Sequence, residues 1–225
     1  GEVSHGSGEC SEVALVDTQL RSLIKQGALQ LDDGSEVDLD AFVQPASLDV
    51  PIVGKAYHVK EKVLPFQKRV RELISDLTLE EKDLGGKGAV LLKGQTYLIF
   101  GGVINLPPGA RGCLSPKSSI GRVDIMVRGV VDGCGLYDIV QGGSARELWL
   151  EVSPRSFNVR IRDGLALTQL MVFMPWDLAL ERFPPPREVG EGGGHPAAVR
   201  GAKAPFAVSS DIYDEKLCFD QEGAP

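Results

Sequence analysis

The sequence predicts an all-β domain with a few short helices, folded as a compact and mostly antiparallel barrel or sandwich. Short apolar segments separated by turn residues fill the region from residue 89 to residue 174, and several alternate apolar with polar side chains, as strands with one buried face do. The 27 glycines and 14 prolines indicate many turns. A chain of 225 residues with 43% hydrophobic residues is long enough for one core and additional segments.

Two short helices and an edge strand are expected in the first third of the chain. Residues 17–27 repeat apolar side chains at helical spacing between Asp17, a candidate N-cap, and Gly27, a typical helix-ending residue. Residues 67–77 show the same period with charged residues at the other positions, which is typical of a helix on a domain surface. Residues 48–52 alternate apolar residues with others and include a proline, which favours an edge strand because proline donates no ladder hydrogen bond.

The strand signal is strongest in the second half of the chain. Strands separated by turn residues are expected in residues 89–102, 110–115, 148–153, 157–162 and 166–174. Asp163 and Gly164 predict a hairpin turn between the last two segments. After Trp176 the sequence becomes rich in proline and glycine, so we place a domain in residues 1–182 and a linker with a C-terminal tail in residues 183–225.

The composition argues against several classes of function. The net charge of −7 disfavours a large basic surface for duplex nucleic acid, so an anionic ligand requires a local basic pocket. No apolar run approaches the about 20 residues that cross a bilayer, and the N-terminal segment lacks the features of a signal peptide. The four cysteines are widely separated, without a CxxC motif. We expect a soluble protein of the cytoplasm or an organelle matrix, not a secreted one.

Residues 115–122 combine hydroxyls, cations and a glycine directly after an expected strand. The hydroxyls of Ser118 and Ser119, with backbone N–H groups at the start of a helical turn, can bind phosphate oxygens. Lys117 and Arg122 supply positive charge, arginine through a planar fork of donors. The segment is therefore a candidate phosphate site, and the alternative is a capped turn with solvated charges.

Glu151 is the second candidate. In the strand expected at residues 148–153, alternation places Glu151 on the same face as Trp149 and Ser153. A partly buried carboxylate there can transfer protons, whereas the alternative is a solvent-facing glutamate or one paired with an arginine such as Arg155. Trp149 could also stack on a base, as could Tyr137, although both residue types more often serve in packing.

Zinc and P-loop chemistry are not expected. The nucleobase deaminases that use zinc carry an H-x-E motif followed by P-C-x-x-C, and His5, His58 and His195 have no such partners. The sequence also lacks a GxxxxGK[ST] P-loop and a strand-linked GxGxxG. We therefore assign no metal-ligating residues.

Four ordered segments together identify a family resemblance. They are residues 44–49 (QPASLD), 116–122 (PKSSIGR), 150–155 (LEVSPR) and 167–173 (LTQLMVF). Their sequence and order resemble the dCTP deaminases of the dUTPase-like superfamily, most of all the first half of the longer, two-repeat bacterial members. The resemblance implies a dUTPase-like β-barrel or sandwich that assembles as a homotrimer, with nucleotide sites at the subunit interfaces.

The resemblance also implies a reaction, which is the hydrolytic deamination of dCTP to dUTP and ammonia without a catalytic metal. Magnesium is expected to arrive with the triphosphate, and zinc is not expected. Glu151 matches the glutamate that activates water in this family. Ser118 and Arg122 match residues that orient the water and the base, and Lys117 and Ser119 are expected near the phosphates.

Asp138 is the nearest match to the acid that reads the sugar and the base, although Ile139 and Val140 replace the Pro-Gly that follows this acid in the family. Two alternatives to dCTP deamination stay open. One is hydrolysis of dUTP. The other is a non-catalytic structural or regulatory subunit of a larger assembly, which the lack of a second repeat and the long linker favour.

Overall fold

The structure, a computed structural model, describes residues 12–31 and 38–184. Residues 14–174 form one compact unit, and the described residues 12–13 and 175–184 belong to a second unit. The compact unit contains the paired strands of two β-sheets, and the second unit contains the short helix α4 (Trp176–Arg182). No helix within the described ranges is long and apolar enough to cross a membrane.

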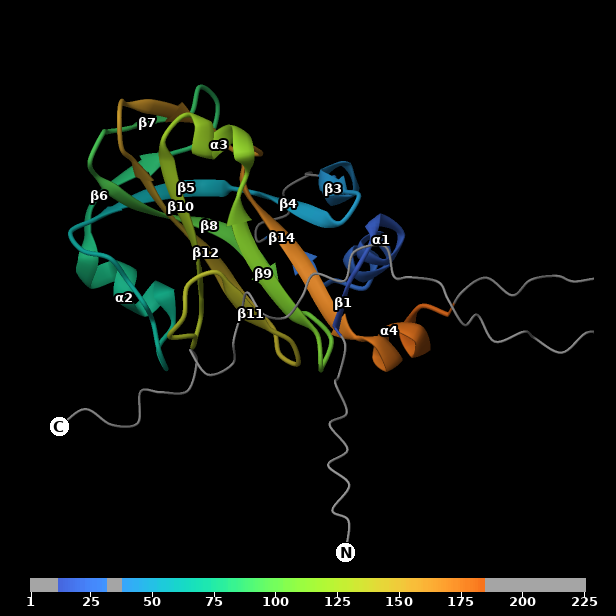
Figure 1. Ribbon diagram of the computed structural model, residues 1–225. Coiled ribbons are helices and arrows are strands. Elements are labelled where there is room, and N and C mark those ends of the chain that lie inside the picture. The colour runs from blue at the N-terminus through green and yellow to red at the C-terminus, as the bar shows by residue number, and fades with distance from the viewer. Residues whose placement is uncertain (1–11, 32–37, 185–225) are drawn as a thin grey trace, which may run out of the picture. The chain divides into compact units, whose positions relative to one another are not determined.

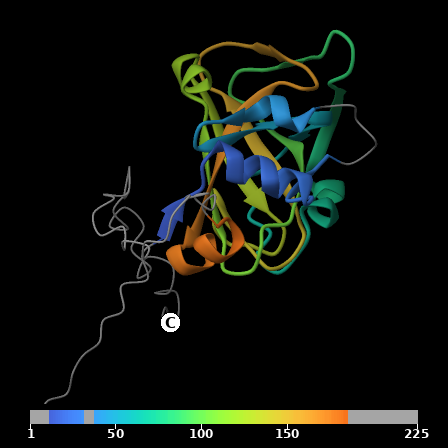
Figure 2. The same ribbon diagram turned by 90° about the vertical axis from the view of Figure 1, so that its right-hand side faces the viewer.

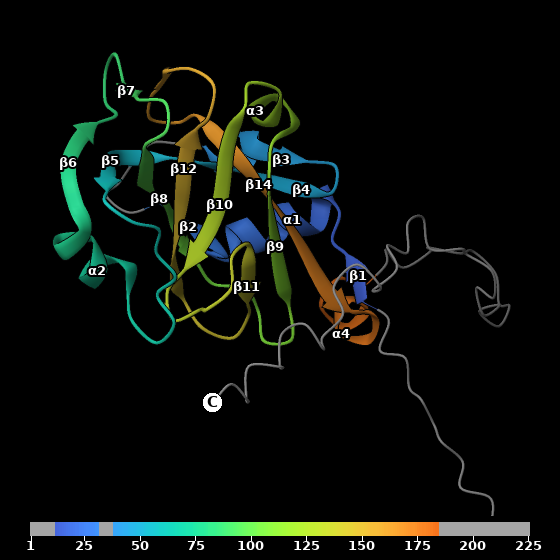
Figure 3. The same cartoon turned by 60° about the vertical axis from the view of Figure 1, so that its left-hand side comes forward.

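Two antiparallel sheets form the compact unit (Figure 1, Figure 3). The first sheet has the strand order β11 (Ile139–Gln141), β9 (Arg111–Pro116), β14 (Ala166–Pro175), β4 (Ser47–Pro51), β3 (Val43–Gln44). The second has the order β10 (Ile125–Val131), β12 (Arg146–Pro154), β8 (Thr96–Ile104), β5 (Val53–Val59), β6 (Thr78–Asp83), and β2 (Leu29–Gln30) also pairs with β8. A separate ribbon joins β7 (Ala89–Leu91) to β13 (Val159–Ile161).

Short elements fill the connections between the strands. They are β1 (Glu12–Ala14), α1 (Asp17–Lys25), the 3₁₀ helix η1 (Leu39–Phe42), α2 (Val70–Leu77) and α3 (Ser118–Arg122). Figure 2 shows α1 running along the side of the compact unit, where it contacts β3 and β4. Helix α3 lies at one end of this unit, and α2 lies nearer the other end, next to β6 (Figure 1, Figure 3).

Strand β12 is buried on both faces. Leu148 on one face and Val50 of the first sheet both lie against Gly101 of β8, so this face looks into the space between the sheets. Trp149 on the opposite face belongs to an apolar cluster that includes Val70 of α2. A strand covered on both sides is a rigid support for any functional side chain that it carries.

The expected helix at residues 17–27 is confirmed, with one correction at its start. Val16, not Asp17, is the N-cap, and the Val16 N–H donates to the Gln19 side chain at 3.0 Å, which leaves Asp17 in the first turn. The end is as expected, because Gly27 has φ +81° and donates its N–H to the Ile24 carbonyl at 2.8 Å. Glycine adopts this left-handed conformation without steric cost.

Two predictions about strand neighbours are wrong. Strand β4 lies between β14 and β3 rather than at an edge, and its proline, Pro51, is the last residue of the strand. Asp163 and Gly164 do not close a hairpin, because β13 pairs with β7 whereas β14 pairs with β4 and β9. The Asp163 carboxylate instead accepts the Gly54 N–H at 2.8 Å, so this turn connects the ribbon to the sheets.

The remaining predicted strands and the helix at residues 70–77 are confirmed. The predicted class, all-β with a few short helices, is also confirmed. Among the described strands, however, no pairing closes either sheet on itself, so no closed barrel is found there. The proposed tail at residues 183–225 lies almost entirely outside the described residues, and that boundary stays a prediction.

Candidate active site

Glu151 lies in the middle of β12, between β10 and β8. Its backbone partner on β10 is Arg128, and its partner on β8 is Leu98. The glutamate side chain is only 2% exposed, and alternation along the strand places it on the face of Trp149, as predicted. A carboxylate is rarely buried to this degree without specific partners, so its contacts decide what it can do.

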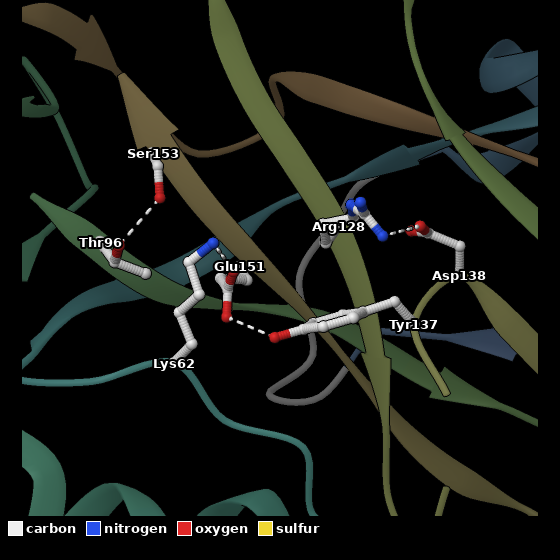
Figure 4. Close-up of polar contacts among 7 residues, drawn as sticks. All are labelled: Lys62, Thr96, Arg128, Tyr137, Asp138, Glu151 and Ser153. Atoms are coloured by element: carbon white, nitrogen blue, oxygen red, sulfur yellow. Dashed lines mark hydrogen bonds and ion pairs between the residues drawn. The ribbon is translucent and has the colours of Figure 1, made fainter. Parts of the chain in front are cut away.

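The two oxygens of the Glu151 carboxylate have different neighbours (Figure 4). The Tyr137 hydroxyl donates to Oε2 at 3.1 Å, and the Lys62 ammonium lies 3.9 Å from Oε1. Burial, the negative charge of Glu151 and this hydrogen bond raise the pKa of Tyr137 to about 12. The phenol therefore stays protonated and remains a donor at physiological pH. Lys62, not Arg155, is the ion-pair partner of Glu151 among the described residues.

Asp138 lies next to this group in a conformation that three hydrogen bonds maintain. Its φ of +66° is in the left-handed region, which aspartate tolerates better than most residues. The Gly129 N–H donates to Asp138 Oδ1 at 2.6 Å, and the Asp138 N–H donates to the Gly129 carbonyl at 2.8 Å. The Asp138 carbonyl accepts the Leu114 N–H at 2.8 Å. Burial raises the pKa of the Asp138 carboxyl, while the Gly129 N–H and nearby Arg128 oppose the rise. Asp138 thus links β10 of one sheet to β9 of the other.

Further polar groups surround Glu151 on the same face. The guanidinium of Arg128 lies 3.5 Å from Asp138 Oδ2 and 5.2 Å from the centre of the Tyr137 ring. The hydroxyls of Ser153 and Thr96 share a hydrogen bond of 2.9 Å (Figure 4).

Sequence reasoning missed Lys62, Arg128 and Thr96, and it considered Tyr137 only for stacking. Alternation along β12 was a usable signal for Ser153. The positions of Arg128 and Thr96 depend on strand register, and those of Lys62 and Tyr137 depend on loop packing. Trp149 is a packing residue, because it is buried and its ring lies 5.2 Å from that of Phe100.

Lys117 joins two of the sequence motifs. Its ammonium forms an ion pair with the buried carboxylate of Asp49, which also accepts the Gln44 side-chain amide at 3.4 Å. The Lys117 N–H donates to the Leu167 carbonyl at 3.1 Å. These contacts tie the start of α3 to β4 and β14, and a phosphate at this position would share the lysine with Asp49.

Ser118, Ser119 and Arg122 lie in α3 with exposed side chains. Within the described ranges of one chain, no hydrogen bond or ion pair connects α3 to Glu151. The structure therefore brings Asp138 together with Glu151, and it leaves the other predicted site residues in a separate, accessible group.

A pocket of about 540 Å³ lies elsewhere, beside the start of α2. It is lined by Gln67, Lys68, Arg69, Asp132, Gly133, Ser144, Ala145, Arg146 and Glu147. Neither Glu151 nor α3 contributes to it. Glu151 is the stronger candidate because one oxygen of its buried carboxylate has no hydrogen-bond donor among the described residues. The carboxylates of the pocket, in contrast, accept from the N–H of Val70 and the side chain of Arg71.

Three comparisons with known proteins bear on this arrangement. A family model described as the 2'-deoxycytidine 5'-triphosphate deaminase (DCD) N-terminal domain matches residues 12–174. The chain belongs to this family. The match spans the compact unit with all four sequence motifs and Glu151, so the dCTP deaminase resemblance of the sequence is confirmed.

One solved structure agrees with this family membership. The 2'-deoxycytidine 5'-triphosphate deaminase from Agrobacterium tumefaciens is similar with a TM-score of 0.67 and 34% identity, over 73% of this chain and 49% of that protein. The chain therefore spans about half the length of this deaminase. A native dUTPase of EIAV is more distant, with a TM-score of 0.32 and 15% identity over 64% of this chain and 99% of that one, and it carries no argument here. Curated protein sequences give no match.

Proposed function

We propose that this dCTP deaminase family member hydrolyses dCTP to dUTP and ammonia, with Glu151 as the general base. The observation that carries the proposal is the environment of the Glu151 carboxylate, which is buried on a central strand. One of its oxygens accepts a hydrogen bond from the Tyr137 phenol, and the other has no hydrogen-bond donor among the described residues. A base that is oriented in advance and sheltered from bulk water suits the attack of water on a ring carbon.

The reaction balances with Glu151 as the only proton carrier. Glu151 takes a proton from water as the water oxygen bonds to C4 of cytosine, and that proton passes to N3 of the ring. The proton of the new hydroxyl group then moves through Glu151 to the 4-amino group. The C4–N bond breaks, ammonia leaves, and C4 keeps the oxygen as the carbonyl of uracil.

The other predicted residues have supporting roles in this proposal. Ser118 and Arg122 orient the water and the base, Lys117 and Ser119 bind near the phosphates, and Asp138 reads the sugar and the base. Because α3 makes no bond to Glu151 within one described chain, we propose a homotrimer in which α3 of one subunit completes the site around Glu151 of a neighbour.

We propose that magnesium enters on the triphosphate and that no zinc takes part. The described residues contain no group of three or more His, Cys, Asp or Glu side chains arranged to hold a metal ion. In this proposal the phosphate oxygens deliver magnesium, which is common for this ion.

The test is to incubate the complete chain with dCTP and magnesium, resolve the nucleotides by chromatography and measure released ammonia. The wild-type chain should form dUTP and ammonia in equal amounts. Glu151→Gln should reduce kcat by roughly a thousandfold or more while dCTP still binds, because general-base catalysis and its coupled steps are lost. Glu61→Gln, a matched change at an exposed neighbouring glutamate, should leave the rate unchanged.

The alternatives give different results in the same experiment. Release of pyrophosphate from dUTP with no ammonia from dCTP would replace deamination by dUTP hydrolysis. Failure to bind either nucleotide, together with stable incorporation into a larger assembly, would instead make the chain a structural or regulatory subunit.

A further inference from the structure

The two oxygens of Glu151 are not equivalent, and the cause lies in the loop between β10 and β11. Tyr137 in this loop donates its hydroxyl to Oε2 at 3.1 Å. Lys62 approaches Oε1 but remains 3.9 Å away, which is longer than a hydrogen bond. Oε1 is therefore the oxygen with free acceptor capacity among the described residues.

We propose that Tyr137 is a positioning residue for the deamination, whose hydroxyl engages Oε2 of Glu151 and so directs Oε1 to the reacting water. This inference rests on the proposed function and adds to it which oxygen acts as the base. Tyr137 does not touch the reacting atoms in this scheme. It acts through Glu151, because a free carboxylate could turn either oxygen toward the water, and the bond to Oε2 leaves only Oε1 in that position.

Tyr137 can do this because its own ring is held in place. The ring packs against the apolar cluster of Trp149 and Val130, and the guanidinium of Arg128 lies 5.2 Å from its centre. The next residue, Asp138, is bonded through backbone and side chain to Gly129. A donor fixed by this many contacts loses little conformational entropy when it binds the carboxylate. The raised pKa of Tyr137, about 12, keeps the proton on the phenol.

Lys62 indicates the side from which water and substrate reach Oε1. Its side chain is 57% exposed although its ammonium lies near a carboxylate that is 2% exposed. A long, exposed side chain can move aside at low cost, unlike the packed Tyr137 ring. Movement of the Lys62 side chain would uncover Oε1, whereas Oε2 stays covered by the Tyr137 hydroxyl.

Tyr137→Phe tests the proposal because it removes the hydroxyl and keeps the ring. In the ammonia assay we expect kcat to fall roughly 10- to 100-fold, the equivalent of one hydrogen bond to a charged group, with KM nearly unchanged. The matched control is Tyr57→Phe, a partly buried tyrosine on β5 whose ring lies 6.0 Å from Trp149. It should leave kcat and KM unchanged.

A second measurement does not depend on turnover. Tyrosines labelled with ¹³C at Cζ are titrated in alkaline solution by NMR, with Tyr137→Phe used to assign the signal and circular dichroism used to confirm folding at each pH. In Glu151→Gln, Tyr137 should ionise at a lower pH than in the wild type, because the negative charge that opposes its ionisation is gone. Lys62, Arg128 and Asp138 also face this pair and are present in both proteins, so the difference reports on Glu151.

The outcomes separate the two proposals. A wild-type chain that releases no ammonia contradicts the proposed function, and the NMR titration alone then decides whether Tyr137 engages Glu151. An active wild-type chain with the same kcat in Tyr137→Phe would overturn the positioning role. An unchanged Tyr137 titration in Glu151→Gln would overturn it as well.

Discussion

Gly129 shows how a single residue shapes the surroundings of the site. A Cβ atom added at Gly129 would lie 2.2 Å from Cδ1 of Leu114 on the opposite sheet. The N–H and the carbonyl of Gly129 are both bonded to Asp138, so the backbone cannot withdraw without breaking these bonds. The absence of a side chain therefore lets β10 approach β9 closely, and the two bonds hold Asp138 against β10.

Gly129→Ala should destabilise the fold by about 1–3 kcal/mol, the usual cost of overpacking a close contact. Urea denaturation followed by circular dichroism measures this free energy of unfolding. The control is Gly121→Ala in α3, where an added Cβ has nothing within 4 Å, and which should be neutral or slightly stabilising because alanine favours a helix. Equal effects of the two substitutions would show that the contact with Leu114 relaxes freely.

At the scale of elements, two loops work as a pair to cover Glu151. The loop before α2 carries Lys62, and the loop after β10 carries Tyr137. Asp132 connects them by accepting the Val70 N–H at the start of α2 at 2.8 Å, and the Gly133 N–H donates to the Lys68 carbonyl at 3.1 Å. The start of α2 and the Tyr137 loop are therefore fixed to each other. This connection holds Lys62 and Tyr137 in place around Glu151.

Burial raises the pKa of the Asp132 carboxyl above its ordinary value, with the Val70 N–H opposing the rise. The folded chain thus holds this proton more tightly than the unfolded chain. In the unfolded chain this carboxyl has a pKa of about 3.9. The contribution of Asp132 to the free energy of unfolding is fully present below that pH, and it is lost as the pH rises through the higher pKa of the folded chain.

Asp132→Asn tests the direction of this pH dependence, because asparagine keeps an oxygen that accepts the Val70 N–H but does not titrate. Relative to the wild type, its free energy of unfolding should increase as the pH rises from about 4 to neutral, measured by urea denaturation at each pH. Asp132→Ala removes the acceptor of the Val70 N–H and should cost about 1–3 kcal/mol at neutral pH, the usual cost of leaving a buried donor unsatisfied. Parallel pH curves for wild type and Asp132→Asn would contradict the raised pKa.

At the scale of the whole molecule, the chain contains one deaminase-family unit and spans 49% of the deaminase from Agrobacterium tumefaciens. In one described chain, Glu151 and its neighbours lie on the second sheet, and the exposed hydroxyls and arginine of α3 form a separate group. The proposed homotrimer would combine the two groups. A closed symmetric oligomer repeats the same contact at every interface, so each interface would gain one complete site.

Mixing two inactive variants tests this shared site. Glu151→Gln and Arg122→Ala should each be inactive alone, but a randomly reassembled mixture should regain activity at roughly a quarter of its sites, those that pair an intact Glu151 with an intact Arg122 from different subunits. Ammonia release measures the recovery, and native mass spectrometry checks that mixed trimers have formed. Mixed trimers without activity would place both residues of each site in the same subunit.

Several features could be predicted from the sequence because their causes are local. The periodicity of Leu20 and Leu23 predicted α1, the alternation around Glu151 predicted its face on β12, and the four ordered motifs identified the family. Strand neighbours were harder to predict. The turn at Asp163 and Gly164 was interpreted as a hairpin, yet its two strands lie in different sheets, because pairing depends on residues far away in the sequence.

The sequence by itself determined the class of the fold, the helices at residues 17–25 and 70–77, many of the longer strands, and Glu151 as a candidate acid on the face of Trp149. It did not predict β5, β6 or β10, which lie in the same sheet as Glu151. Only the tertiary structure decided which groups face that carboxylate. Lys62, Arg128 and Tyr137 come from three different segments, and their convergence follows from strand register and from the packing of one loop on another. These are long-range interactions, in which each contact depends on the free energy of the whole fold rather than on the propensity of its own segment.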